Sequence, residues 1–238
     1  MPRETQGISE RPPVAISPTA VESRFLTRVY AWMAAGLAVT ALASAVTLSN
    51  PAFLQVILGN RIVFWGLMLG ELGLVAWLSG LVGRMSAGMA SGIFLLYSAL
   101  NGLTLSVVFL VFTRESIAST FVVSAATFGA MSAYGLATKR ALDGLGSFCF
   151  MGLVGVIIAS LVNMFLHSSM LGFVTSCVGV IVFVGLTAYD TRKLKMMAAV
   201  VDPDSEEGRR GAVSGALALY LDFINLFLML LNLFGRRR

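Results

Sequence analysis

The chain has 238 residues, of which 57% are hydrophobic and only 12% are charged, and its mean hydropathy is +0.86. A water-soluble domain of this length needs more polar surface, so the composition indicates an integral membrane protein. The formal net charge is +5. Because the basic residues lie in short segments between apolar stretches, where they set membrane orientation, nucleic-acid binding is not expected.

The N-terminal segment, residues 1–25, is rich in proline and mixes basic, acidic and hydroxyl side chains, which predicts a disordered tail. It lacks the pattern of a secretory signal peptide, and no small-residue cleavage site follows the first apolar stretch. That stretch is therefore expected to stay as a membrane helix. We divide the chain into a tail, residues 1–25, and a transmembrane domain, residues 26–238.

Seven apolar segments in the transmembrane domain are long enough to cross about 30 Å of hydrocarbon as helices. The sequence therefore predicts an all-α membrane protein with seven transmembrane helices. Asn50-Pro51 ends the first of them, and the polar segment 191–211 is expected to extend the sixth helix and then turn at Asp202-Pro203. The predicted spans are residues 29–48, 62–83, 87–112, 117–137, 145–166, 170–190 and 213–234.

The distribution of lysine and arginine predicts the orientation of these helices. With the N-terminus in the cytoplasm, twelve of the seventeen basic residues lie on the cytoplasmic side, as the positive-inside rule requires. Seven crossings then leave Arg236, Arg237 and Arg238 outside, against the rule. Either the rule fails at this terminus or the last segment does not cross fully, and the sequence leaves both alternatives open.

Two aspartates in consecutive apolar segments are the strongest functional candidates. Asp222 lies inside the last segment, with Asn225 three residues later and Asn232 ten residues later on roughly the same predicted helical face. Asp190 lies at the cytoplasmic end of the segment before. A carboxylate at bilayer depth costs at least about 2.5 kcal/mol, so a buried acid is a functional candidate. Two carboxylates that share a site cannot both ionise cheaply, so this pair is a candidate proton sensor.

Simpler interpretations of both aspartates stay open. Asp222 can be a polar residue that a neighbouring helix satisfies, although asparagine or serine would serve that purpose at lower cost. Asp190 can be neutralised at the membrane interface by Arg192 and Lys193, which follow it in the sequence. The pairing of the two acids at similar depth favours a functional role.

Glu71 and Arg84 are supporting candidates from the second apolar segment. Glu71 lies near its middle, where an acid commonly marks an ion or proton pathway. The alternative for Glu71 is a neutral acid, or one hydrogen-bonded to Asn101 or to a serine or threonine of a neighbouring helix. Arg84, at the cytoplasmic end, is either a charge partner for the aspartates or an ordinary positive-inside anchor.

Enzymatic chemistry finds little support in the sequence. The one histidine, His167, lies in a short loop without cysteine or carboxylate neighbours, so neither a metal site nor a Ser-His-Asp set is expected. The two membrane aspartates invite comparison with intramembrane aspartyl proteases. Those proteases share a GxGD motif at the second aspartate, whereas Asp222 lies in YLDFIN without a preceding glycine. We therefore expect no enzyme activity and no cofactor.

Long sequence stretches resemble a known family. They are ELGLV, GLTAYDTRKLK, ALALYLDFINLFLMLLNLFG and AATFGAMSAYGLATKRALDGLGSFCFMGLVGVIIASLVNMFL. Together they resemble bacterial Bax inhibitor-1 (transmembrane BAX inhibitor motif) proteins over nearly the whole chain after the tail. The resemblance implies seven helices, of which the last is central and is wrapped by two three-helix layers.

The resemblance also implies a function, a pH-sensitive calcium leak channel in the bacterial inner (cytoplasmic) membrane. Asp190 and Asp222 match the two aspartates that control the leak, which are hydrogen-bonded to each other in the closed state. An arginine of the second helix can act as a latch, for which Arg84 is the candidate, and Glu71 matches the acid of the ELG segment. Ca²⁺ and protons are then the ions handled, and Ca²⁺ would bind the two aspartates only weakly and transiently, since a tight site needs six to eight oxygen ligands.

A different function is also open from the resemblance. Some bacterial relatives look like partners of membrane-bound quality-control proteases, so the chain can be a regulatory membrane protein that binds such a protease or another complex without conducting ions. The exposed tail, residues 1–25, is the natural contact segment for that role.

Overall fold

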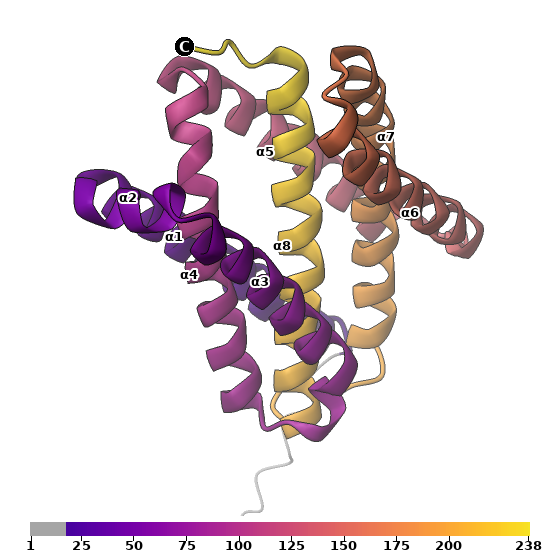
Figure 1. The fold of residues 1–238 in the computed structure, drawn as a ribbon. Helices are drawn as coiled ribbons and strands as arrows, with labels where there is room; N and C mark the ends of the chain where they lie inside the picture. Colours follow the sequence, from indigo (N-terminus) through magenta and orange to yellow (C-terminus); the bar gives the residue numbers. More distant parts are fainter. Residues whose placement is uncertain (1–17) are drawn as a thin grey trace, which may run out of the picture.

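The computed structural model describes residues 18–238, and within them the chain forms eight α-helices, one 3-10 turn and no sheet (Figure 1). Of the described helices, all except α2 are long and apolar enough to cross a membrane, seven in total. This confirms the predicted all-α fold. The elements are α1 (Pro18–Ser49), α2 (Pro51–Gly59), α3 (Arg61–Leu81), η1 (Val82–Arg84), α4 (Ala87–Val111), α5 (Arg114–Ala137), α6 (Asp143–Leu166), α7 (Ser169–Ala198) and α8 (Glu206–Phe234).

The boundaries of the first two helices differ from the prediction. Helix α1 begins at Pro18, inside the predicted tail; the rest of that tail, residues 1–17, lies outside the described residues. Asn50 and Pro51 end α1 as predicted, but they also start a short helix, because the Asn50 side chain accepts hydrogen bonds from the first free N–H groups and Pro51 occupies the first turn. Helix α2 was not predicted, since nine residues are too few to cross a membrane.

Helix α8 lies at the centre of the bundle, between two layers of three membrane helices. It packs against α1 and α4 on one side and against α5 and α7 on the other, while α3 packs on α4 and α6 packs on α7. In Figure 1, α8 runs through the middle of the molecule in yellow. This arrangement confirms the predicted central helix within two three-helix layers, α1–α3–α4 and α5–α6–α7.

Small residues allow the helices to approach closely within each layer. A Cβ atom at Gly102 of α4 would collide with the Thr40 carbonyl oxygen of α1. A Cβ atom at Gly135 of α5 would lie 2.6 Å from the Ala188 carbonyl oxygen of α7. Membrane helices pack through such contacts because lipid provides no hydrophobic drive for their association.

The two ends of the bundle carry different turns. The α3–α4 and α7–α8 turns meet at one end, where Glu206 Oε1 accepts a hydrogen bond from Ala87 N. The α4–α5 turn and the C-terminal residues meet at the other end, where Thr113 N donates to Arg236 O over 3.0 Å. We call these the N-terminal face and the C-terminal face. Helix α8 therefore runs from one face to the other, and the terminal arginines lie opposite the N-terminal face.

Candidate functional site

Asp222 lies in the middle part of α8, where helices on both sides enclose it. The residue is 4% exposed. Its Oδ2 atom has no hydrogen-bond partner among the residues that the structure describes. Buried carboxylate oxygens are normally paired, since an unpaired one loses its hydration without compensation. Asp222 is therefore buried in the last membrane helix, as the sequence predicted, and its Oδ2 atom has no partner within residues 18–238.

Asp190 lies on α7 close to Asp222. Helix α7 continues to Ala198, in agreement with the predicted helical extension beyond the membrane segment, so Asp190 is more than two turns from the helix end. The Asp190 side chain is half-buried. It lies near enough to Asp222 for the two carboxyl groups to interact electrostatically. Lys193, one turn later on α7, also interacts electrostatically with Asp190. The structure thus brings the two aspartates, the aspartate pair, into one electrostatic site.

The neighbours of the aspartate pair direct their own hydrogen bonds elsewhere. The Thr187 hydroxyl, one turn before Asp190, donates to the Phe183 carbonyl oxygen over 2.7 Å. The Thr191 hydroxyl donates over 3.4 Å to the Ser132 hydroxyl of α5. Cys149 of α6 is 2% exposed and lies close enough to Asp222 to interact with it electrostatically. A buried free cysteine otherwise behaves as a small apolar side chain. Within residues 18–238, neither threonine hydroxyl donates a hydrogen bond to Asp222.

The remaining predicted members of the site lie outside the aspartate pair. Asn225 donates to the Leu221 carbonyl oxygen of its own helix over 2.8 Å. Asn232, near the end of α8, is exposed, whereas Asp222 is buried. Arg84 is exposed in η1, and within residues 18–238 it forms no ion pair with either aspartate. Its role as a latch stays a prediction.

A second buried polar cluster, the tyrosine network, lies on the other side of α8. The Tyr220 hydroxyl lies 2.6 Å from Thr40 Oγ1 of α1 and 3.3 Å from Asn101 Oδ1 of α4. The Asn101 amide donates to the Tyr97 hydroxyl over 3.3 Å. Tyr220 precedes Asp222 by two residues, a rotation of roughly 200° around a helix of 3.6 residues per turn. Helix α8 therefore presents Tyr220 to the α1–α3–α4 layer and Asp222 to the α5–α6–α7 layer.

Glu71 lies next to the tyrosine network and not next to the aspartate pair. Its Oε1 atom accepts a hydrogen bond from the Thr104 hydroxyl over 2.9 Å, and Thr104 follows Asn101 by one turn of α4. A threonine of a neighbouring helix is one of the partners that the sequence allowed for Glu71. Sequence reasoning did not single out Thr40, Tyr97, Thr104 or Tyr220. The available signal was Tyr220, because a tyrosine hydroxyl in the middle of a membrane segment needs a partner.

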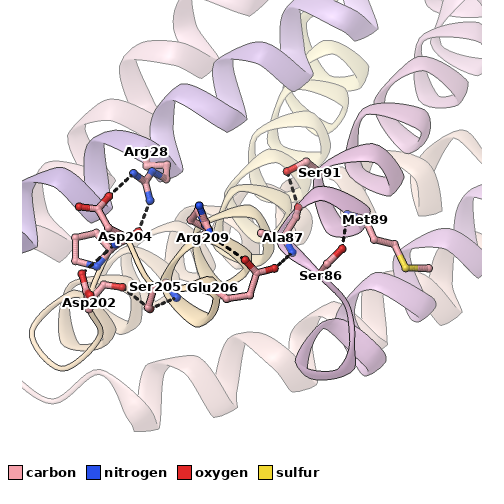
Figure 2. A network of polar contacts seen from close by, with 12 residues as sticks. Arg28, Ser86, Ala87, Met89, Ser91, Asp202, Asp204, Ser205, Glu206 and Arg209 are labelled. Carbon is pink, nitrogen blue, oxygen red and sulfur yellow. Dashed lines mark hydrogen bonds and ion pairs between the residues drawn. The ribbon is translucent and has the colours of Figure 1, made fainter.

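The turn between α7 and α8 joins the two helices that carry the aspartates, and polar contacts fasten it to α1 and α4. Figure 2 shows Arg28 of α1 donating to Asp204 Oδ1 over 3.0 Å, and Glu206 accepting from the Ala87 N–H of α4. Arg28 also donates to the Pro203 carbonyl oxygen. Arg209, one turn into α8, pairs with Glu206 at 2.9 Å. A cavity of about 540 Å³ opens beside these residues on the N-terminal face.

The sequence is similar to known proteins along nearly all of the described chain. Residues 22–238 match the family described as inhibitor of apoptosis-promoting Bax1. The chain belongs to the Bax inhibitor-1 family. The match includes part or all of every transmembrane helix, and it confirms the resemblance that the sequence stretches indicated over nearly the whole chain after the tail.

Individual relatives are similar in sequence to this Bax inhibitor-1 family member along almost their entire length. Inner membrane protein YbhL of Escherichia coli is 50% identical over 224 residues, 94% of this chain and 96% of YbhL. A protein of Borreliella burgdorferi is 44% identical over 92% of this chain and 94% of its own length. A membrane protein of Streptococcus pyogenes is 37% identical over 90% and 93%, respectively.

Proposed function

We propose that this Bax inhibitor-1 family member is a pH-sensitive cation leak channel of the bacterial inner membrane, with the aspartate pair as its gate. The observation that supports this most is the buried, unpartnered Oδ2 atom of Asp222, next to a second acid on the adjoining helix. An acid that only joined packed helices would be expected to have its buried oxygens hydrogen-bonded. The similarity to an inner membrane protein of Escherichia coli supports the location, and the basic residues favour a cytoplasmic N-terminus.

The proposed gate works through the charge of the pair. When the pair holds a proton, like-charge repulsion between the two groups is absent, and α7 and α8 stay together. When both groups ionise, like-charge repulsion and the loss of hydration favour separation of the carboxylates and entry of water and a cation between the helices. Ca²⁺ suits this site because it prefers oxygen ligands. Two carboxylates hold it weakly, and conduction requires release as well as binding.

The test is calcium uptake into proteoliposomes at several pH values between about pH 6 and pH 8, because the apparent pKa values of a coupled acid pair have to be measured on the pair itself. The variants are Asp222→Asn and Asp190→Asn, which keep the shape of the side chain but hold it permanently uncharged. Wild type is expected to leak more as the pH rises. Asp222→Asn is expected to hold flux near the low-pH level at every pH. Asp143→Asn, the same change at an exposed position at the start of α6, is the matched control and should behave as wild type.

Two outcomes contradict the gate. If Asp222→Asn conducts as wild type does with the same pH dependence, the aspartate pair is not the gate. If folded wild type conducts nothing at any pH, the leak itself is refuted. The second result would favour the regulatory alternative, a membrane protein that binds a protease or another complex, and a deletion of residues 1–17 would then test that binding.

A further inference from the structure

The last residues of the chain are fastened to the C-terminal face by backbone hydrogen bonds. They run antiparallel to the α4–α5 turn, where Thr113 N donates to Arg236 O over 3.0 Å and Arg238 N donates to Val111 O over 2.9 Å. Arg236 N also donates to the Ser116 hydroxyl over 3.0 Å. The positions of these arginines are therefore set by main-chain contacts, which do not depend on the arginine side chains.

Four arginines gather in this place, and we call Arg114, Arg236, Arg237 and Arg238 the terminal arginine patch. Arg114 begins α5 directly after the turn, and all four residues are exposed. The Arg237 guanidinium lies 6.0 Å from the centre of the Phe112 ring. Every salt bridge among the described residues lies on the N-terminal face. The protein itself therefore leaves the positive charge of the patch largely uncompensated, with Glu115 as the acid adjoining it.

The side chains around the patch place it at the edge of the membrane. Phe234, the last residue of α8, is 71% exposed, and Leu110 and Val111 at the end of α4 are 40% and 39% exposed. Large apolar side chains exposed on a membrane helix face lipid tails. Arg114 follows Val111 by three residues and Arg236 follows Phe234 by two, so both arginines lie just beyond the apolar ends of α4 and α8. A guanidinium presents parallel N–H donors that match two phosphate oxygens.

We propose that the terminal arginine patch binds the phosphate headgroups of anionic phospholipids in the leaflet at the C-terminal face and holds the end of α8 at that surface. Three adjoining arginines on the side that the positive-inside rule disfavours then have a binding partner. The proposal does not depend on the cation leak, since neither the aspartate pair nor the tyrosine network contributes to it.

The test is lipid retention by the full chain, measured by native mass spectrometry with phosphatidylglycerol and, separately, phosphatidylcholine. The double variant Arg236→Gln/Arg238→Gln removes two charges but keeps the backbone hydrogen bonds and the contact of Arg237 with Phe112. An arginine near an anionic surface contributes roughly fivefold in affinity, so we expect a loss on the order of 25-fold for phosphatidylglycerol and none for phosphatidylcholine. Arg61→Gln, at an isolated exposed arginine that begins α3, is expected to lose fivefold at most.

Two further arms separate the sources of phosphate and the kind of contact. Arg236→Lys/Arg238→Lys keeps the charge but loses the paired donors, so retention between wild type and the glutamine variant supports bidentate binding. Inorganic phosphate at low concentration should not displace the lipid; if it does, the patch is a free-anion site and the proposal is wrong. Unchanged phosphatidylglycerol retention in the glutamine variant, with folding confirmed by circular dichroism, also overturns it.

Discussion

Replacement of Tyr220 by phenylalanine tests whether the tyrosine network holds α8 against the α1–α3–α4 layer. Tyr220 is fully buried, and its ring packs edge-to-face against Phe94 and Tyr97 with centroid distances of 5.8 Å in both cases. A phenylalanine ring keeps these contacts. The substitution therefore removes the hydroxyl group alone, with its contacts at 2.6 Å to Thr40 and 3.3 Å to Asn101.

The expected loss of unfolding free energy follows from what remains hydrogen-bonded. The Thr40 hydroxyl keeps two carbonyl acceptors, Ser98 O at 2.9 Å and Gly36 O at 3.0 Å. Asn101 Oδ1, in a half-buried residue, loses its donor. Hydrogen bonds between membrane helices contribute about 0.6 kcal/mol on average and about 1.7 kcal/mol at most. We therefore expect Tyr220→Phe to destabilise the protein by about 1 kcal/mol.

Reversible unfolding in mixed detergent micelles, followed by circular dichroism, measures this loss. Tyr134→Phe is the matched control, because Tyr134 is 45% exposed, and it should stay within about 0.5 kcal/mol of wild type. A double-mutant cycle with Thr40→Val should give a coupling energy of about 0.5 kcal/mol or more. The reasoning is refuted if Tyr220→Phe is as neutral as Tyr134→Phe, or if the cycle shows no coupling.

Other substitutions test the packing, the Glu71 contact and the fastening of the α7–α8 turn by the same unfolding measurement. Gly135→Ala should destabilise by about 1–3 kcal/mol, because its Cβ would lie 2.6 Å from the Ala188 carbonyl oxygen. Gly129→Ala on the same helix meets open space and should be neutral or stabilising by up to about 1 kcal/mol; equal effects of the two would contradict the close α5–α7 contact. Thr104→Val removes the donor to Glu71 and should cost about 0.6–1.7 kcal/mol, whereas Thr104→Ser should cost less; a reversed order would contradict the contact. Asp204→Asn removes ion pairs with Arg28 and Arg24 that are mostly exposed, so the loss should be below about 1 kcal/mol and should disappear in about 1 M salt; a loss that is unchanged by salt would contradict it.

Several features of the chain follow from interactions within a few residues, and the sequence alone predicted them. The apolar segments became the seven membrane helices, because each is long enough to satisfy its own backbone in lipid. Asn50-Pro51 ended α1, and α7 extended beyond the membrane segment to a turn at Asp202-Pro203. The two aspartates were visible because an acid in an apolar segment is rare.

Which side chains meet one another depends on contacts between distant parts of the chain, and only the tertiary structure decided this. Thr40 and Tyr220 are 180 residues apart in the sequence, so no local pattern links them. The face of α8 that carries Asp222 is buried because α7 lies beside it, whereas Asn232 is exposed. Glu71 joined the tyrosine network and not the aspartates, since α3 packs on α4.

The position of the C-terminal residues also depends on both the local sequence and the tertiary contacts. The basic residues left two alternatives for the last segment, because three arginines there oppose a full crossing. In the structure, hydrogen bonds of Arg236 and Arg238 with the α4–α5 turn place the C-terminal residues at the end of the bundle opposite the α7–α8 turn. Charge counting treats each loop separately, whereas these contacts form only after α4, α5 and α8 have packed together. Length and hydropathy therefore determined which segments are membrane helices, and helix packing determined which polar groups meet between them.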